Sequence, residues 1–556
     1  MKNILYNLTI LLFIFAVTSC EKVEDTVINK EETIKKSVTL NVGINNNTTK
    51  ISLGEKDGTG SYSMLWSNGD EIAVINNGRL FKFTINAEDA GKQSATFTCE
   101  DGYYFDESKE IIAYYPYEAV SYSYGQIYCN VPYQQIYTTS SFDKSAFHMA
   151  AKRASGNSGP LSFNYLFGII KLKINGGAFN KLVGTIKIGS SSPLSHSSST
   201  LNTNTLKVEI PQTGFYNSEL KCNESSNGIS INNSTDFIIV VPAGEQILGF
   251  LINTYETTGS FNKGYYKRTT SYKNITAGSI LTLPEINLSN ESTRSHMEVQ
   301  NWTSRKYSHS IGSFITSYVY GRMIGYTLWA DTNVGSSVSN EYESSNYPGN
   351  LFQWGRKDGM YLAEVVDGPF NLSSGTPDPG KYYSKYGFDW CTPSYDQMWN
   401  TNTGDDKEIN PTKSETDPCP NGWRVPTATE FNNLFGNYIS NVDYQEFWDD
   451  SNPGYFIQQG YEFSGKTDYD LAKSKNHTVT LPYGGVYGYQ SSVEGQTIIP
   501  KNLSRFRDGA YYWTSSVDGE MALGATFTIP EGANAIDPII NQHHRAQARQ
   551  IRCVKE

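Results

Sequence analysis

The cysteines and histidines of this sequence are the side chains that could bind metal ions or take part in catalysis. The cysteines are Cys20, Cys99, Cys129, Cys222, Cys391, Cys419 and Cys553. No two of them have the C-x-x-C spacing of zinc sites, and no histidines have the H-E-x-x-H spacing. We interpret the adjacent His543 and His544, which precede the last predicted strand, as facing solvent. The sequence therefore predicts no metal site and no cofactor.

Motifs for covalent catalysis are also missing from the sequence. It contains no G-x-S-x-G turn, which exposes a nucleophilic serine, and no glycine-rich loop that would hold phosphates. The many Asp and Glu residues cannot be assigned as glycosidase pairs, because that chemistry needs carboxylates at a defined separation. We predict that the protein is not an enzyme.

Tryptophans are the remaining candidates for a binding site. Trp354, Trp390 and Trp399 are our ligand-binding candidates, since aromatic rings offer large rigid faces for stacking on sugars. Trp390 and Trp399 lie in a stretch rich in Gly, Pro, Asp and Ser that has no clear strand pattern. The alternative is that these rings fill a core, and we predict that role for Trp423 and Trp513.

The first 19 residues predict export. Lys2 precedes a largely apolar run from Leu8 to Val17, and small residues follow before Cys20. This is the pattern of a signal peptide, and the alternative is a retained membrane anchor. The small residues and Cys20 resemble a bacterial lipobox, which implies acylation of Cys20. Glu21, Glu24 and Asp25 resemble the acidic start of surface lipoproteins of Bacteroidetes, which implies a lipid-anchored, surface-exposed protein of the outer membrane.

Composition narrows the class of protein further. The formal net charge is −11 and no basic block is present, so nothing predicts a nucleic-acid partner. A charged fraction of 18% with 48 Gly and 39 Tyr is typical of a β-rich extracellular protein. Residues 20–36 are polar without an apolar period, and we interpret them as a flexible tether.

Short strands dominate residues 37–289. Val38, Leu40, Val42 and Ile44 alternate with other residues, as in a half-buried strand. Further short apolar segments follow at regular spacing, separated by Gly, Pro and Asn, which favours antiparallel sandwiches. The segments are 63–76, 94–100, 110–117, 127–132, 162–174, 183–189, 236–244, 246–255 and 277–288. We place the boundary between two sandwiches, 37–150 and 151–289, in the Gly- and Ser-containing stretch 151–159.

These landmarks resemble the fimbrillin-like (Mfa-like) family of Bacteroidetes. The resemblance rests on LWSNGDEIAV, AYYPY, LFGIIKLKI, IIVVPAGE and the closing ITAGSILTLPEINL. It implies two transthyretin-like β-sandwich domains of the kind found in pilins. It also implies pilin subunits as partners, because pilins of this family assemble by adding a strand to an open sheet edge.

After a polar linker at 290–305, the sequence CPNGWRVPTATEFNNLF (419–435) predicts a turn followed by a short helix. Thr427 and Glu430 have the spacing of a capping box. Phe431, Leu434, Phe435 and Tyr438 form an apolar stripe at helical spacing.

This motif, together with YWTSS (512–516) and IRCVKE (551–556), resembles the Fibrobacter succinogenes major paralogous domain. That family implies an α+β C-type-lectin-like fold over residues 306–556, related to formylglycine-generating enzymes. The calcium-binding triplets of calcium-dependent lectins are absent, so calcium-mediated sugar coordination is not predicted.

The lectin-like resemblance places the start of the helix beside the last strand, which implies a disulfide between Cys419 and Cys553. The alternative is two buried free thiols. We predict that Cys222 and Cys391 stay unpaired, while the sequence leaves the pairing of Cys99 and Cys129 open. With Cys419 and Cys553 at structural positions, we do not predict formylglycine-type catalysis.

The resulting prediction is a mainly β protein with two sandwiches and a lectin-like C-terminal domain. Its predicted role is adhesion at the cell surface, as a tip or accessory subunit of a pilus, with a host or dietary glycan or a protein as ligand. The alternative function is a surface lipoprotein that captures glycans for nutrient uptake.

Overall fold

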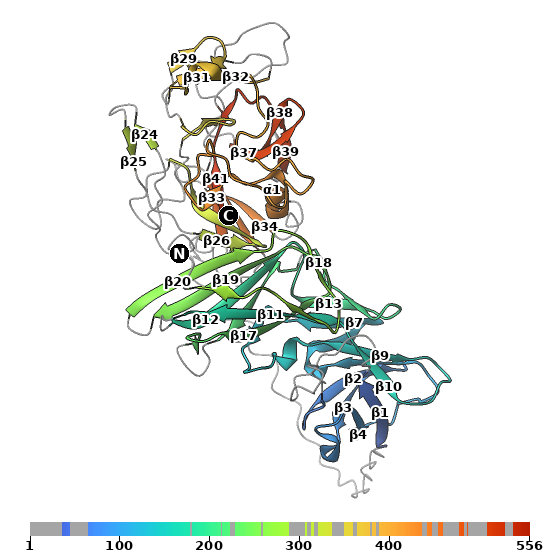
Figure 1. The fold of residues 1–556 in the computed structure, drawn as a ribbon. Coiled ribbons are helices and arrows are strands. Elements are labelled where there is room, and N and C mark those ends of the chain that lie inside the picture. Colours follow the sequence, from blue (N-terminus) through green and yellow to red (C-terminus); the bar gives the residue numbers. More distant parts are fainter. Residues whose placement is uncertain are drawn as a thin grey trace, which may run out of the picture.

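The computed structural model is mainly β, with three units stacked end to end (Figure 1). The predicted signal peptide, Cys20, most of the tether and the 290–305 linker lie outside the residues that the structure describes. No described helix is long and apolar enough to cross a membrane. The described residues are 36–44, 65–177, 181–212, 214–222, 228–256, 259–288, 306–308, 313–315, 321–335, 350–359, 364–378, 381–384, 388–435, 442–447, 454–459, 478–482, 486, 509–528 and 537–556.

The first unit is a closed barrel in which the strand order is β1-β10-β9-β5-β2-β3-β4. Its strands are β1 (Val38–Ile44), β2 (Glu71–Asn76), β3 (Arg79–Ile85), β4 (Ser94–Cys99), β5 (Ile111–Tyr115), β9 (Met149–Arg153) and β10 (Leu161–Tyr165). The alternation predicted for the first strand is confirmed, because Val38, Leu40, Val42 and Ile44 are all buried. Strand β1 closes the barrel: it pairs antiparallel with β4 over six residue pairs and parallel with β10 over three.

The second unit is built from three larger sheets and one separate pair of strands. One sheet has the order β17-β11-β22, a second β20-β19-β12-β15-β8, and a third β14-β13-β7-β6, with β18 and β21 as a separate pair. The strands are β6 (Val120–Ser123), β7 (Gln126–Val131), β8 (Gln134–Ile136), β11 (Phe167–Asn175), β12 (Lys181–Ser190), β13 (His196–Asn202), β14 (Lys207–Glu209), β15 (Asn217–Lys221), β16 (Ile229–Ser230), β17 (Thr235–Pro242), β18 (Gly244–Gln246), β19 (Leu248–Glu256), β20 (Gly259–Arg268), β21 (Lys273–Ile275), β22 (Ile280–Thr282) and β23 (Ile286–Asn287).

The boundary expected within residues 151–159 needs correction. Those residues end β9 and form the connection to β10, and both strands belong to the barrel. In addition, residues 120–136 leave the barrel and pair with strands of the second unit, since β7 pairs with β13 and β8 with β15. The chain therefore contributes β6, β7 and β8 to sheets of the second unit before it returns to the barrel at β9. Hydrophobic periodicity reveals strands but not their partners, which is why the sequence pattern missed this arrangement.

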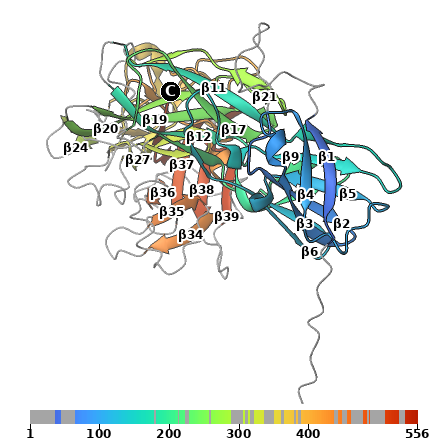
Figure 2. The same cartoon turned by 90° about the horizontal axis from the view of Figure 1, so that it is seen from below.

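The C-terminal domain, from residue 306 onward, contains several small sheets and the helix α1 (Ala428–Phe435). Figure 2 shows β34 to β39 on the side of the molecule away from the barrel strands. The remaining strands are β24 (Lys306–Ser308), β25 (Ser313–Ile315), β26 (Gly321–Ile324), β27 (Thr327–Asn333), β28 (Phe352–Gln353), β29 (Glu364–Val366), β30 (Phe370–Asn371), β31 (Lys381–Tyr383), β32 (Cys391–Thr392), β33 (Trp423–Arg424), β34 (Val442–Phe447), β35 (Gly454–Gln459), β36 (Thr478–Pro482), β37 (Gly509–Asp518), β38 (Met521–Thr528), β39 (Asp537–His543), β40 (Ala548–Arg549) and β41 (Arg552–Lys555).

Helix α1 begins as the sequence predicted. The Glu430 carboxylate accepts a hydrogen bond from the Thr427 backbone N–H at 2.9 Å, and the Thr427 hydroxyl accepts one from the Glu430 N–H at 3.3 Å. This reciprocal pair is a capping box. Phe431 and Leu434 are buried, so the apolar stripe faces the core, while Tyr438 lies outside the described residues.

The barrel core contains one buried histidine, from which a pH effect follows. The side chain of His148 is fully buried, with its Nδ1 2.7 Å from the Tyr114 hydroxyl. Burial lowers the pKa of His148 to about 3, because the charged imidazolium would lose its hydration. In the unfolded chain the pKa returns to about 6.5. The unfolded state therefore binds more protons, and barrel stability falls as the pH drops from about 6.5 toward 3.

We expect His148→Gln to reduce this acid sensitivity, since glutamine stays neutral. Amide hydrogen exchange of β5 and β9 at pH 7.5 and 4.5 measures it, as protection factors relative to the unfolded chain at each pH: acid should lower the protection factors more in the wild type than in the variant. His196→Gln, at a half-exposed site, is the control. Equal acid effects in wild type and His148→Gln would contradict the prediction.

Candidate functional site at the junction with the C-terminal domain

The second unit presents one row of residues to the C-terminal domain. Asn217 on β15 pairs in register with Gly189 on β12, Gly189 pairs with Gly249 on β19, and Gly249 pairs with Arg268 on β20. Four neighbouring strands thus contribute one residue each at a single level of the sheet. The two central positions are glycines, so the row has a notch in its middle with polar side chains on both sides. We call these four residues the docking row.

A tight turn of the C-terminal domain occupies this notch. Gly325 and Tyr326 connect β26 to β27, and their carbonyl oxygens lie directly over the two glycines. A Cβ atom added to Gly189 would lie 1.7 Å from the Gly325 oxygen, and one added to Gly249 would lie 2.2 Å from the Tyr326 oxygen. Both distances are far below van der Waals contact. The turn can approach this closely only because neither glycine has a side chain.

Side chains beside the notch hydrogen-bond the same two carbonyls. The Asn217 amide donates to the Gly325 oxygen at 3.0 Å, and the Tyr266 hydroxyl donates to the Tyr326 oxygen at 2.6 Å. Both bonds are buried, so both turn carbonyls are satisfied without water. The turn is therefore held by specific polar contacts as well as by its shape.

Apolar packing surrounds these polar contacts. Leu251 and Tyr266 of the second unit belong to the same buried cluster as Met323 and Leu328 of the C-terminal domain. Tyr216 joins a second cluster on the C-terminal side. Because both clusters span the two units, the junction has a continuous core, and rigid attachment is the expected behaviour.

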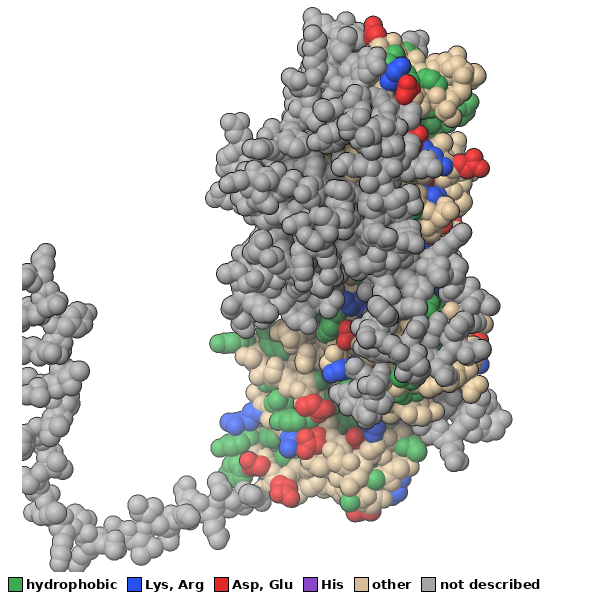
Figure 3. All heavy atoms as spheres, turned by 90° about the vertical axis from the view of Figure 1, so that its left-hand side faces the viewer, with side chains coloured by type: hydrophobic (Ala, Val, Ile, Leu, Met, Phe, Trp, Pro, Cys, Tyr) green, Lys and Arg blue, Asp and Glu red, His purple; other side chains and the backbone are tan. Residues whose placement is uncertain are grey.

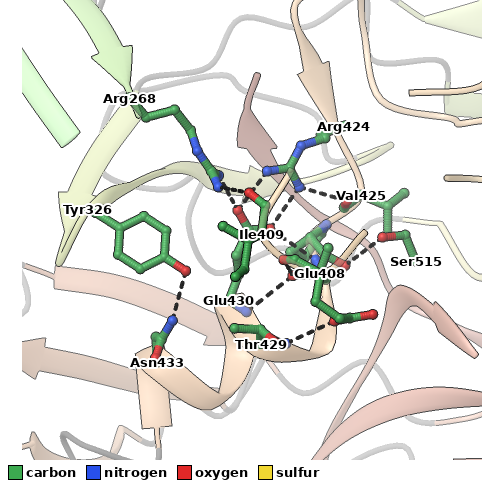
Figure 4. Close-up of polar contacts among 12 residues, drawn as sticks. Arg268, Tyr326, Glu408, Ile409, Arg424, Val425, Thr429, Glu430, Asn433 and Ser515 are labelled. Carbon is green, nitrogen blue, oxygen red and sulfur yellow. Dashed lines mark hydrogen bonds and ion pairs between the residues drawn. The ribbon is translucent and has the colours of Figure 1, made fainter. Parts of the chain in front are cut away.

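Arg268, at the end of the docking row, reaches the start of helix α1 (Figure 4). One guanidinium nitrogen lies 2.5 Å from a Glu430 carboxylate oxygen, and the other donates to the Ile409 carbonyl at 2.5 Å. Arg424 approaches the same carboxylate from within the C-terminal domain, with bonds of 2.6 and 2.7 Å to its two oxygens. Glu430 therefore links the two units while it also caps the helix.

This cluster is buried and remains ionised. The exposed fractions of the Arg268, Glu430 and Arg424 side chains are 7%, 0% and 3%. Burial alone would raise the pKa of Glu430, but the charges and hydrogen bonds of Arg424 and Arg268 outweigh it and hold the pKa at about 2. The carboxylate is charged at any physiological pH, and its partners satisfy it. Such an arrangement fixes geometry and provides no acid, base or nucleophile for catalysis.

Residues 296–555 match the family model of the Fibrobacter succinogenes major domain. This part of the chain is a Fibrobacter succinogenes major domain. The comparison with curated proteins found no match.

Three solved structures have a distant likeness to this chain. A candidate cell adhesion protein from Bacteroides ovatus is 12% identical, with a TM-score of 0.30, over 46% of this chain and 94% of that one. A fimbrial protein from Bacteroides ovatus is 10% identical, with a TM-score of 0.19, over 94% and 100%. The tip fimbrial protein Mfa3 from Porphyromonas gingivalis, with C-terminal truncation, is 10% identical, with a TM-score of 0.20, over 42% and 81%.

The three tryptophans predicted to bind a ligand all lie inside the Fibrobacter succinogenes major domain. Trp354, Trp390 and Trp399 are each at most 1% exposed. Their indole N–H groups donate to backbone carbonyls, as in the 2.6 Å bond from Trp390 to the Trp354 oxygen. In this structure they present no ring face to a ligand, and we do not propose them as binding residues. Sequence cannot distinguish a ligand-facing tryptophan from one that fills the core of a loop-rich domain.

The predicted disulfide, the two predicted free thiols Cys222 and Cys391 and the two predicted core tryptophans are confirmed. A disulfide joins Cys419 and Cys553, whose Cα atoms are 6.0 Å apart, while Cys99, Cys129, Cys222 and Cys391 are buried free thiols. Trp423 and Trp513 are buried, as predicted. No group of metal-binding side chains is found in the described part of the chain.

Sequence reasoning missed the docking row entirely. Gly189, Gly249 and Arg268 lie in ordinary strand patterns, and nothing in those patterns indicates that the three are register partners. The only available signal was Gly325 in MIGYT (323–327), which is compatible with a tight turn but does not indicate its partner.

Proposed function

We propose that this protein is a cell-surface adhesin of the fimbrial type, anchored by a lipid on Cys20, with the Fibrobacter succinogenes major domain as its distal head. The observation that supports this most directly is the junction. A domain held by a flexible linker alone would sample many orientations. Here the docking row, two hydrogen-bonded carbonyls and a buried ion-pair cluster give the head one fixed orientation relative to the second unit.

The position of the tether supports the same proposal. The Gly102 N–H donates to the Lys36 carbonyl at 2.9 Å, so the described chain starts against the barrel. The barrel lies at the end of the molecule opposite to β29, β31 and β32 of the head (Figure 1). Attachment to a membrane near the barrel would direct the head outward. Figure 3 shows basic and acidic side chains intermixed on the visible barrel surface, without a patch of one sign.

Pilin subunits are the proposed partners. Strand β1 is bound to β10 by three residue pairs, half the number that bind it to β4 on its other side. A strand from another subunit that adds at this seam would meet backbone groups already arranged for pairing. The fimbrillin-like landmarks in the sequence support the same partner class.

Two measurements on the native host test this proposal. Cys20→Ser should move the protein from the outer-membrane fraction to the medium and remove adherence of the cells. Mild surface crosslinking followed by pull-down of the wild type should recover pilin subunits. Recovery of a polysaccharide porin complex instead, or retention of the Cys20→Ser protein in the membrane, would contradict the proposal.

A further inference from the structure

A turn at the far end of the head is built around one buried arginine. The guanidinium of Arg545, whose residue is 1% exposed, donates to Asp396 at 2.5 Å and to the Ser394 hydroxyl at 2.9 Å. Its Nη1 also lies 3.6 Å from the Asp389 carboxylate. Arg545 thereby binds both ends of the segment 389–396 from the buried side of the segment. We call residues 388–396 together with His544 the aromatic turn.

Asp389 fixes the inside of this turn. One carboxylate oxygen accepts the Trp390 backbone N–H at 2.7 Å, and the other accepts the Ser394 hydroxyl at 2.5 Å. The Trp390 ring is buried beneath, where its indole N–H bonds the Trp354 carbonyl. The segment therefore has its conformation before any ligand arrives, and a preordered site loses less entropy on binding.

The aromatic turn presents rings to solvent on this rigid base. Tyr395 is 51% exposed and Phe388 is 37% exposed. Phe388 stacks on His544 with ring centres 5.1 Å apart and an interplanar angle of 23°. Phe388 contacts His544, and Asp396, next to Tyr395, binds Arg545, next to His544. Both exposed rings therefore belong to the two segments that Arg545 joins. Rigid aromatic side chains of this kind provide contact area at low entropic cost.

Charge around the turn selects the type of ligand. The Asp396 side chain is 54% exposed. Asp518 and Glu520 are exposed in the neighbouring turn, whose Gly519 carbonyl accepts a bond from Arg545 at 3.2 Å. Arg545 itself is covered, so the accessible charges are mainly acidic, and the whole chain carries −11. Such a surface repels anionic ligands and offers carboxylate acceptors to hydroxyl donors.

We propose that the aromatic turn binds a neutral pyranose unit of an oligosaccharide without a metal ion. The flat C–H face of a pyranose ring packs on Tyr395 and the Phe388–His544 pair, and Asp396 accepts hydrogen bonds from its hydroxyl groups. Uronic and sialic acids are disfavoured because their carboxylates would face Asp396 and the Asp518–Glu520 turn. This inference rests on the proposed function, since it supplies the ligand class of an adhesin head.

An array of neutral and acidic oligosaccharides, including cellohexaose and hexagalacturonate, tests the inference with the full mature chain in the presence of EDTA. We expect binding to neutral pyranosides and none to acidic ones. Titration with the strongest neutral probe should show about a tenfold loss of affinity in Phe388→Ala and in Tyr395→Ala, the scale of one aromatic contact. Asp396→Asn should also weaken binding while leaving the two aromatic residues in place.

Tyr103→Ala and Tyr104→Ala serve as matched controls, because both rings are more than half exposed but lie on the barrel. They should bind like wild type. Absence of any neutral ligand, dependence on calcium, or full affinity in both Phe388→Ala and Tyr395→Ala would overturn the inference. If cells that carry these head variants adhere normally, the adhesin proposal stands and only the proposed sugar site is rejected. Failure of wild-type adherence would remove the adhesin proposal itself.

Discussion

Replacing Glu430 by glutamine is expected to lower the free energy of unfolding of the C-terminal domain by about 3–5 kcal/mol, the usual scale for removing one member of a buried ion pair. The variant would leave Arg268 and Arg424 buried next to each other without their shared carboxylate. It would also weaken the capping box, because a neutral amide is a poorer acceptor for the Thr427 N–H. Both effects act on the junction and on α1 together.

Urea unfolding followed by tryptophan fluorescence measures this loss. Glu71→Gln is the matched control, because its ion pair with Lys82 lies on the surface, where solvent screens the charges and its removal should change the unfolding midpoint little. Thr427→Ala separates the cap from the ion pairs and should cost about 1 kcal/mol. A shift in Glu430→Gln no larger than that in Glu71→Gln would show that the cluster does not hold the head.

The same cluster has a defined pH window. The pKa of Glu430 falls from about 4.5 in the unfolded chain to about 2 in the folded one. Its contribution is therefore complete above pH 4.5 and is lost as the pH falls toward 2. The wild type should lose this contribution over that range, and Glu430→Gln should not.

Removing the disulfide is expected to have the second large effect. Cys419 and Cys553 are 134 residues apart in sequence. The chain-entropy estimate for a loop of this size is about 5 kcal/mol of stabilisation, through restriction of the unfolded chain. Cys419→Ala/Cys553→Ala should therefore unfold at a clearly lower urea concentration than the wild type.

Dithiothreitol provides the internal control for this experiment. It should lower the wild-type midpoint to that of the double variant and leave the variant unchanged. Cys391→Ala, which removes a buried free thiol from the same domain, should respond to the reductant as the wild type does. A reductant effect on the double variant would place the redox-sensitive contact elsewhere.

Local features of this protein were predictable from its sequence, and contacts between distant segments were not. The capping box at Thr427 and Glu430 was recognisable because its two members are three residues apart. The disulfide followed from the resemblance to a known domain. By contrast, the placement of β6 to β8 in sheets of the second unit depends on which strands pair, and strand patterns do not encode partners.

The candidate sites illustrate the same limit. Trp390 was predicted as a ligand contact because of its residue type, yet it is buried, and the exposed aromatic residues of that turn are Phe388 and Tyr395. Which of several adjacent aromatic residues faces outward depends on Arg545, about 150 positions later in the chain, through its bond to Asp396. Glu430 was identified as a cap, but its second role requires Arg268 from another unit.

The pair of glycines in the docking row sets a rule for exchanging heads between proteins. A sandwich with any larger residue at Gly189 or Gly249 cannot accept the Gly325–Tyr326 turn, whatever its other contacts. A sandwich with glycines at two register partners on adjacent strands, flanked by an amide and an arginine, has the shape and hydrogen-bonding groups to accept it. The two glycines are thus a requirement for this coupling that is independent of what the head binds.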